Sequence, residues 1–192
     1  MVDFSSVYRG APPWDIGRPQ KELVRLEEAG EIVGSVLDVG CGTGENALFL
    51  AVKGHDVWGV DFTSIAIEKA RHKATERNLN VTFLTRNALE LHTLGRTFDT
   101  VVDSGLFHVL NDEERPQFVS NLTSVLNRYG TYFMLCFSEL EPGSYGPRRV
   151  TQSDIRNAFD GTWHINYIRP AQMESRLQID GIHAWLSSIS KE

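Results

Sequence analysis

The sequence lacks the features that mark secreted, membrane-bound and disulfide-rich proteins. It has two cysteines in 192 residues, Cys41 and Cys136, which are too few for a disulfide framework and lack the spacing of metal ligands. Its first residues contain no basic segment followed by an apolar one, and no later stretch reaches the length of a membrane span. We therefore predict a cytoplasmic protein with two packed thiols, no metal site and no membrane partner.

An excess of positive charge is also absent. The chain has 19 Lys and Arg against 25 Asp and Glu, which gives a formal net charge of −6. A protein of this sign offers no broad attraction for phosphate backbones, so we expect no nucleic-acid partner. The length and the 41% hydrophobic content fit a single domain over residues 1–192 with one sizeable core.

Short apolar runs alternate with longer helical periods, without an internal repeat or a low-complexity linker. Strands are predicted at 35–39, 56–61, 81–86, 98–104 and 131–138, and helices at 45–53, 64–77 and 113–127. Two further strands, 163–169 and 182–189, have no clear helix between them and should pair as an antiparallel edge. This rhythm predicts an α/β fold with a Rossmann-like, doubly wound seven-stranded sheet, mostly parallel with an antiparallel C-terminal strand.

Residues 38–44 read DVGCGTG, directly after an apolar run. Glycine permits backbone angles and close approaches that a Cβ would block, so we expect a ligand against the main chain at Gly40, Gly42 and Gly44, with Cys41 among them. A dinucleotide-binding loop would carry a third glycine where this chain has Glu45. That carboxylate opposes a phosphate group, and no Lys or Arg within the loop compensates it.

S-adenosylmethionine suits this acidic loop better, because it has no phosphate and carries an ammonium and a sulfonium cation. Asp38 either orients the loop or lies near the positive end of the ligand. Asp61 ends the next strand about twenty residues on, where a carboxylate accepts ribose hydroxyls, and a turn aspartate is the alternative. Phe62 packs either on adenine or in the core. Asn87, followed by Ala88, either contacts the adenine edge or forms a turn.

The sequence resembles the class I S-adenosylmethionine-dependent methyltransferases through VLDVGCGTG, VWGVDFTSIAIEKAR, RNALEL, FDTVVDSGLFHVL and LNRYGTYFMLCFS. A narrower similarity, to the halide/thiol and thiopurine methyltransferase group, appears in PPWDIGRPQ, DEERPQF and GPRRVTQSDI. The resemblance implies S-adenosylmethionine as the cofactor and a small-molecule acceptor. It also implies that residues 1–30 cap the site, with Trp14 and the stretch 17–20 covering cofactor or substrate. Arg18 either contacts the cofactor carboxylate or pairs with Glu22.

Methyl transfer is an in-line displacement, so the protein mainly has to hold donor and acceptor in contact and exclude water. His108, just beyond the fourth predicted strand, is the candidate general base, and a histidine that caps or packs under the loop is the alternative. Ser104 should line the cofactor through its backbone, and Phe107 should form an apolar wall near the methyl group. Tyr145 and Arg149 are expected in the acceptor pocket.

The acceptor predicted from the sequence is a thiol, a halide or a thiopurine-like sulfur, which needs no base once it is ionised. The alternative is O- or N-methylation of an aromatic heterocycle such as a hydroxyquinolone or phenol, with His108 as base. Glu45 disfavours an NAD-dependent oxidoreductase, and a non-catalytic nucleotide-binding module would require a closed acceptor pocket. The sequence predicts no particular oligomeric state.

Overall fold

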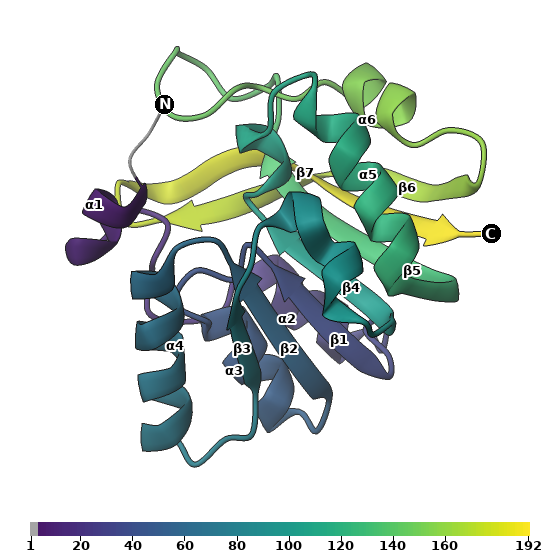
Figure 1. Ribbon diagram of the computed structural model, residues 1–192. Coiled ribbons are helices and arrows are strands. Elements are labelled where there is room, and N and C mark those ends of the chain that lie inside the picture. The colour runs from purple at the N-terminus through teal and green to yellow at the C-terminus, as the bar shows by residue number, and fades with distance from the viewer. Residues whose placement is uncertain (1–3) are drawn as a thin grey trace.

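The computed structural model describes residues 4–192, and at its centre is one sheet of seven strands (Figure 1). The strands are β1 (Ser35–Val39), β2 (Asp56–Asp61), β3 (Thr82–Thr85), β4 (Phe98–Ser104), β5 (Leu126–Phe137), β6 (Trp163–Ser175) and β7 (Gln178–Lys191). Their order in the sheet is β3-β2-β1-β4-β5-β7-β6, with β7 antiparallel to both neighbours. The predicted Rossmann-like, mostly parallel α/β sheet is confirmed, and so is the antiparallel pairing of its last two strands.

Helices cover both faces of this sheet. One face is covered by α2 (Lys21–Glu28), α3 (Glu45–Val52) and α4 (Ser64–Glu76), and the other by the 3-10 helix η1 (Ala88–Leu94), α5 (Glu114–Val125) and α6 (Gln152–Ala158). The short α1 (Phe4–Arg9) contacts α4, and a second 3-10 helix, η2 (Phe107–Val109), follows β4. The predicted helices correspond to α3, α4 and α5, whereas the hydrophobic pattern did not anticipate α1, α2 and α6.

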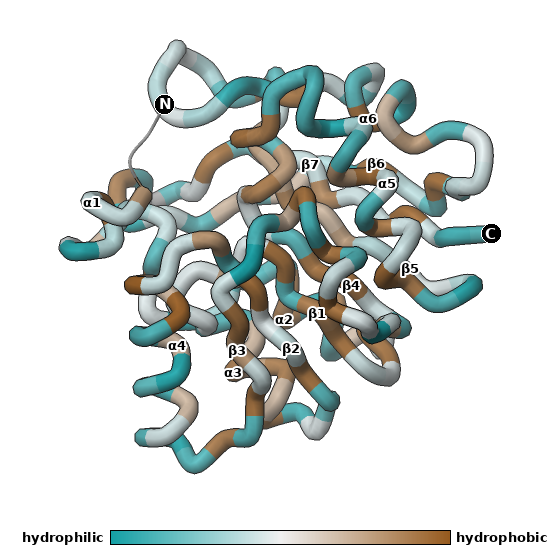
Figure 2. Tube along the Cα trace, in the orientation of Figure 1, coloured by the Kyte–Doolittle hydropathy of each residue, from teal (hydrophilic) through white to brown (hydrophobic). Residues whose placement is uncertain are grey.

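Side chains of the central strands alternate between two hydrophobic clusters, one on each face of the sheet. Along β5, one cluster receives Tyr132, Met134 and Cys136, and the other receives Phe133, Leu135 and Phe137. Strands covered on both faces are hydrophobic nearly throughout, and the brown stretches of Figure 2 lie mainly on these strands. Both cysteines are free and buried in the clusters, as predicted for packed thiols.

β5 begins at Leu126, where the sequence predicts the last turn of a helix. Lys191, at the end of β7, donates to the carbonyls of Thr123 (2.7 Å) and Leu126 (2.8 Å). These bonds satisfy carbonyls at the C-terminal end of α5, so the helix stops two residues before the predicted end. The strand partner that supplies this cap is distant in sequence, which explains why the boundary was missed.

The close packing of Gly44, before α3, can be tested by substitution. Gly44 has φ +85°, and a Cβ there would stand 2.7 Å from Phe83 Cζ and 2.9 Å from Ala70 Cβ. Gly44→Ala should lower the free energy of unfolding by about 2–4 kcal/mol, because backbone strain adds to overpacking. Gly54→Ala is the control, since Gly54 has φ +97° and no atom within 4 Å of the added Cβ. Urea unfolding should show a loss of only about 1 kcal/mol for the control, and equal losses would contradict the packing role.

Candidate active site

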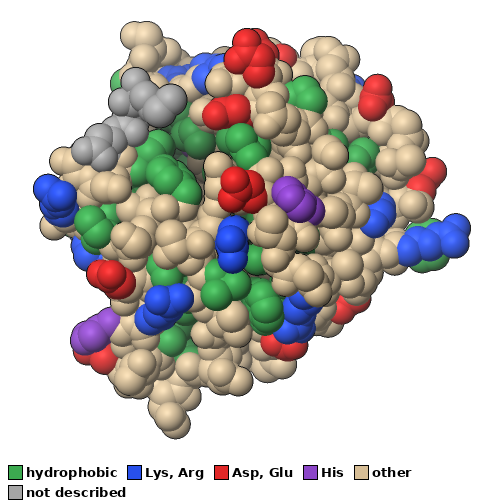
Figure 3. All heavy atoms as spheres, viewed as in Figure 1, with side chains coloured by type: hydrophobic (Ala, Val, Ile, Leu, Met, Phe, Trp, Pro, Cys, Tyr) green, Lys and Arg blue, Asp and Glu red, His purple; other side chains and the backbone are tan. Residues whose placement is uncertain are grey.

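The strand order reverses between β1 and β4, so the loops that follow these two strands diverge. In open α/β sheets, this switch point at the carboxyl ends of the strands is where ligands bind. At this edge the surface is hollowed between α1 and the loop after β5, and hydrophobic side chains gather around the hollow (Figure 3). The glycine loop after β1 and the chain after β2 and β4 reach the same edge.

The glycine loop leaves no room for side chains. Gly40, Gly42 and Gly44 have φ of +71°, +53° and +85°. A Cβ at Gly40 would stand 3.1 Å from Leu106 Cβ, and a Cβ at Gly42 would stand 2.8 Å from the Tyr8 hydroxyl. Leu106 and Tyr8 thus occupy the space that side chains at Gly40 and Gly42 would need, and a ligand against this backbone stays a prediction.

Asp61, at the end of β2, holds this loop through backbone hydrogen bonds. Its Oδ2 accepts from the Gly42 N–H (3.0 Å), and its Oδ1 accepts from the Thr63 N–H (2.8 Å). Each carboxylate oxygen has a second lone pair that a ribose hydroxyl could use. Phe62 is an exposed ring whose centroid lies 5.6 Å from that of Phe4 in the N-terminal segment. It is therefore not a core aromatic.

Three buried carboxylates meet at this edge, one from each of β1, β2 and β4. Asp38, Asp61 and Asp103 are 1%, 7% and 2% exposed. Burial, followed by the charge of Asp103, raises the pKa of Asp38 to about 8. Burial also raises the pKa of Asp61, and it raises that of Asp103 to about 6. Asp38 Oδ2 has no hydrogen-bond partner within residues 4–192. With a pKa of about 8, Asp38 is mostly protonated at pH 7 in the unliganded protein, and a cation beside it would favour its ionised form.

Asp103 shapes the turn that follows β4. Its Oδ1 accepts from the Leu106 N–H (2.7 Å), and its Oδ2 accepts from the Phe107 N–H (3.0 Å) and the Tyr132 hydroxyl (2.7 Å). Ser104 is half-buried at the end of β4, and its contact with the cofactor stays a prediction. Asp103 is therefore a structural acceptor whose hydrogen bonds fix the turn beyond Ser104.

The N-terminal segment folds onto the glycine loop. Tyr8 is buried there and accepts a hydrogen bond from Trp14 Nε1 (3.0 Å), while Lys69 donates to the Tyr8 carbonyl (2.6 Å). Burial and then the charge of Asp61 raise the pKa of the Tyr8 hydroxyl. The cap over the site by residues 1–30 stays a prediction, and residues 1–3 lie outside the described part of the chain.

Arg18 and Glu45 have different partners from those considered in the sequence. Arg18 donates to Glu174 on β6 (2.8 Å), so it clamps the N-terminal segment to that strand and does not pair with Glu22. Glu45 pairs with Lys73 (2.8 Å) and Arg77 (2.8 Å) of α4. Burial opposes ionisation of Glu45, but these hydrogen bonds outweigh it and lower its pKa. The charge of Glu45 is therefore compensated, so Glu45 does not disfavour a ligand with a phosphate group. The three buried aspartates do.

Asn87 forms the turn that was the alternative to an adenine contact. Its Oδ1 accepts from the Leu89 N–H (3.0 Å) and caps η1, in which Ala88 is the first residue and is buried. The adenine contact of this segment stays a prediction.

His108 has a fixed tautomer that does not suit a base. Its Nδ1 accepts from the Phe137 N–H (3.1 Å), and a backbone N–H can only donate. In the neutral ring the proton is then on Nε2, which lies beside Gly105. Burial, followed by the charges of Arg115 and Arg149, lowers the pKa of His108 to about 3. The structure thus corrects the assignment as general base: His108 is a packed histidine whose Nε2 is a donor.

The three predicted acceptor-binding residues lie in different settings. Phe107 is fully buried in the core against Phe159, so it cannot form the expected wall. Arg149 directs its Nε, Nη1 and Nη2 groups at carbonyls of its own loop, those of Glu141, Pro142, Gly143, Tyr145 and Pro147. With its donors used in this way, Arg149 holds the loop and does not bind an acidic acceptor. Tyr145 remains exposed at the edge and donates to Glu141.

The described residues contain no group of His, Cys, Asp and Glu side chains that could hold a metal ion. Within residues 4–192, no helix is long and apolar enough to cross a bilayer.

Residues 36–130 match the family described as a methyltransferase domain. The chain is 35% identical over 181 residues to a 2-heptyl-1-hydroxyquinolin-4(1H)-one methyltransferase of Mycobacteroides abscessus, covering 88% of this chain and 80% of that one. It is 28% identical over 148 residues to a probable thiol methyltransferase of Arabidopsis thaliana, covering 76% and 65%. A structure solved for the conversion of a disulfide bond into a thioacetal group during echinomycin biosynthesis superposes with a TM-score of 0.90 at 34% identity, covering 98% and 91%.

Fold and site together define an α/β enzyme that binds a nucleoside cofactor at the switch point of its sheet. More narrowly, the chain belongs to the class I S-adenosylmethionine-dependent methyltransferases. Solved proteins of this fold hold S-adenosylmethionine or S-adenosylhomocysteine, and S-adenosylmethionine is the cofactor of this enzyme. The site fits this group, because a cation beside the buried Asp38 would compensate the carboxylate oxygen that has no partner within the described residues.

The ionisation of Asp38 should make the stability of the unliganded protein depend on pH. The folded protein holds this proton more tightly than the unfolded chain, whose Asp has a pKa near 3.8. The raised pKa of Asp38 therefore stabilises the folded protein fully below about pH 4, and this stabilisation is lost as the pH rises through about 8. Between pH 6 and pH 9, wild type should lose about 2–3 kcal/mol more stability than Asp38→Asn, measured by urea unfolding. The exposed Asp160→Asn serves as control and should follow wild type; parallel curves for all three proteins would contradict the buried charge.

Proposed function

We propose that this enzyme transfers the methyl group of S-adenosylmethionine to an oxygen of a hydroxylated aromatic heterocycle that carries an apolar substituent. The observation that carries the proposal is the apolar edge of the site. Six of the nine exposed large hydrophobic side chains of the described chain lie at the carboxyl edge of the sheet: Trp14, Phe62, Val109, Leu140, Tyr145 and Leu177. A gathering of this kind is typical of a surface that binds an apolar ligand.

The Mycobacteroides relative supports this acceptor class, because its name specifies a hydroxyquinolone with a heptyl chain. A planar heterocycle could lie against the aromatic rings of Trp14 and Tyr145, and an alkyl chain could cover Leu140 or Leu177. The described part of the edge carries Glu141 and Arg149 in internal hydrogen bonds, so neither is left to select a charged acceptor.

On the cofactor side, we assign the roles predicted from the sequence. Asp61 receives the ribose hydroxyls, Asp38 faces the positive end of the cofactor, and the exposed Phe62 ring packs on adenine. The remaining neighbours of the cofactor in this proposal are Trp14, Gly40, Cys41, Gly42, Gly44, Asn87, Ala88 and Ser104. The cofactor supplies an activated methyl group, and these residues hold it in line with the acceptor and exclude water.

Sulfur is the second candidate acceptor, as the sequence first suggested. The similar structure was solved for the conversion of a disulfide bond into a thioacetal group, and the Arabidopsis relative is named for thiols. A thiolate needs no general base, which is consistent with the donor tautomer of His108.

An acceptor panel separates the two candidates. S-adenosylhomocysteine formation should be fastest with 2-heptyl-1-hydroxyquinolin-4-one. The kcat/KM for this compound should be about 10-fold or more above that for the unsubstituted hydroxyquinolone, because each buried methylene contributes about 0.8 kcal/mol. Turnover restricted to aromatic thiols, thiopurines or iodide would replace this proposal with the second candidate.

A matched pair of variants tests the apolar edge. Leu140→Ser should reduce the preference for the heptyl compound, because Leu140 lies on the loop after β5 and is 55% exposed. Val33→Ser removes a similarly exposed side chain, 52%, ahead of β1 at the opposite edge and should leave the preference unchanged.

A further inference from the structure

His183 and Glu141 form a side-chain pair at the acceptor end of the sheet. The His183 carbonyl accepts from the Ser138 N–H (3.0 Å), which places this residue beside the point where the chain leaves β5. Glu141 Oε2 accepts from the His183 backbone N–H (2.7 Å) and lies 2.9 Å from the ring Nδ1. The His183 side chain is 57% exposed, whereas that of Glu141 is 3% exposed. A buried carboxylate thus holds an accessible imidazole by one nitrogen.

The carboxylate fixes the tautomer of this imidazole. Burial opposes ionisation of Glu141, but the hydrogen bonds from Tyr145 and His183 outweigh it and lower its pKa to about 2. An ionised carboxylate can only accept, so Nδ1 of His183 donates and Nε2 of the neutral ring carries the lone pair. His108 has the opposite tautomer, because its Nδ1 accepts from the Phe137 N–H. Of these two histidines, only His183 is arranged to take a proton.

Contacts connect this pair to the end of β4. The His108 ring lies 4.9 Å from that of Phe137, and the Arg149 guanidinium lies 5.3 Å from the Phe137 ring and 5.2 Å from the Tyr145 ring. Tyr145 in turn donates to Glu141. In Figure 1 the β6–β7 hairpin crosses behind the hollow seen in Figure 3. His183 therefore lies beside the carboxyl end of β5, at the same edge of the sheet as the candidate site.

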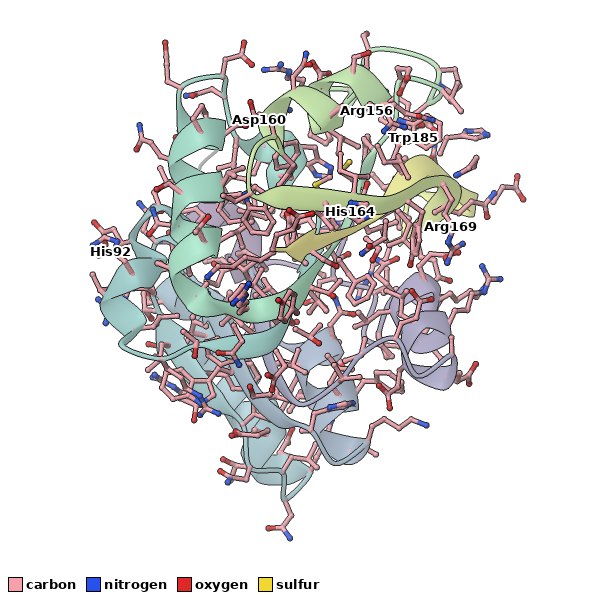
Figure 4. The ribbon with its side chains drawn as sticks, turned by 90° about the vertical axis from the view of Figure 1, so that its right-hand side faces the viewer. His92, Arg156, Asp160, His164, Arg169 and Trp185 are labelled. Atoms are coloured by element: carbon pink, nitrogen blue, oxygen red, sulfur yellow. The ribbon has the colours of Figure 1, made fainter. Side chains whose placement is uncertain are left out.

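The surroundings of His183 carry little competing charge. Within the described residues, Glu141 is the acid that touches the ring, and Gln178 on β7 and Tyr145 share the same carboxylate. Arg149 faces the cluster from the loop after β5 but donates to loop carbonyls, and Gln172 is the neutral residue opposite His183 on β6. Figure 4 looks onto the β6 edge of this hairpin, with His164 on β6 and Trp185, two residues after His183, on β7.

We propose that His183 is the general base of the reaction and that Glu141 is its positioning residue. The proton of the acceptor hydroxyl moves to Nε2 of His183. The freed electron pair on the oxygen forms the bond to the methyl carbon, and the carbon–sulfur bond breaks with its electron pair remaining on sulfur. The imidazolium then gives its proton to water. This inference rests on the proposed function, since an ionised thiolate or a halide needs no base.

The test compares acceptors that differ in ionisation. With a phenol that is un-ionised at the assay pH, His183→Gln should lower kcat about 100-fold and remove the rise of kcat with pH that wild type shows. With an aromatic thiol that is already ionised, the same variant should change kcat less than about 2-fold. Glu141→Gln should show the same contrast between acceptors, and His164→Gln, an exposed histidine near the other end of the hairpin, should match wild type with both. Equal losses with both acceptors, or no loss with either, would overturn the proposal.

A spectroscopic measurement keeps the inference separate from the proposed function. Nitrogen-15 NMR of the whole protein should show an unprotonated Nε2 for His183 and a protonated Nε2 for His108. Adding S-adenosylhomocysteine with 2-heptyl-1-hydroxyquinolin-4-one should shift the His183 ring signals and leave those of His164 in place. If wild type methylates no oxygen acceptor, the proposed function fails; a shift at His183 would then still support its place in the acceptor site. A protonated His183 Nε2, or no shift, would overturn it.

Discussion

The cost of burying three carboxylates at one edge of the sheet governs the rest of this structure. Removing an ionised carboxylate from water costs several kcal/mol unless hydrogen bonds or a counter-charge compensate it. Asp103 is compensated by three donors and Asp61 by two, whereas one oxygen of Asp38 has no partner within the described chain. The parallel register of β1, β2 and β4 brings the three together, so the fold itself creates a site for a cation.

The cofactor side and the acceptor side are built in different ways. The cofactor side consists of short-range elements: a strand, a glycine turn and a carboxylate at the end of the next strand. The acceptor side is assembled from distant segments. Arg18 and Lys21 both reach Glu174 on β6, and the Arg176 N–H bonds to the Pro13 carbonyl. These contacts tie the N-terminal segment to the β6–β7 hairpin.

This difference explains what could be predicted from the sequence. The glycine loop and Asp61 could be located from the sequence, because strand, turn and next strand follow one another in the chain, whereas their contacts with the cofactor stay predictions. Phe107 was misplaced because its distance from β4 says nothing about which way a 3-10 turn points its side chain. The pair of His183 and Glu141 was missed because 42 residues separate them and only the antiparallel β7 brings them together. Glu45 was thought to be uncompensated because its partners lie on the next helix.

The central claim is that the buried aspartates make this a site for a cationic cofactor, and calorimetric titration tests it most directly. S-adenosylmethionine should bind at pH 7 and NAD should not. Because the pKa of Asp38 is about 8 in the unliganded protein, binding of the cation should release about one proton, so the measured enthalpy should change with the ionisation enthalpy of the buffer. In Asp38→Asn the buffer dependence should disappear. Comparable binding of NAD, or the same buffer dependence in both proteins, would contradict the account.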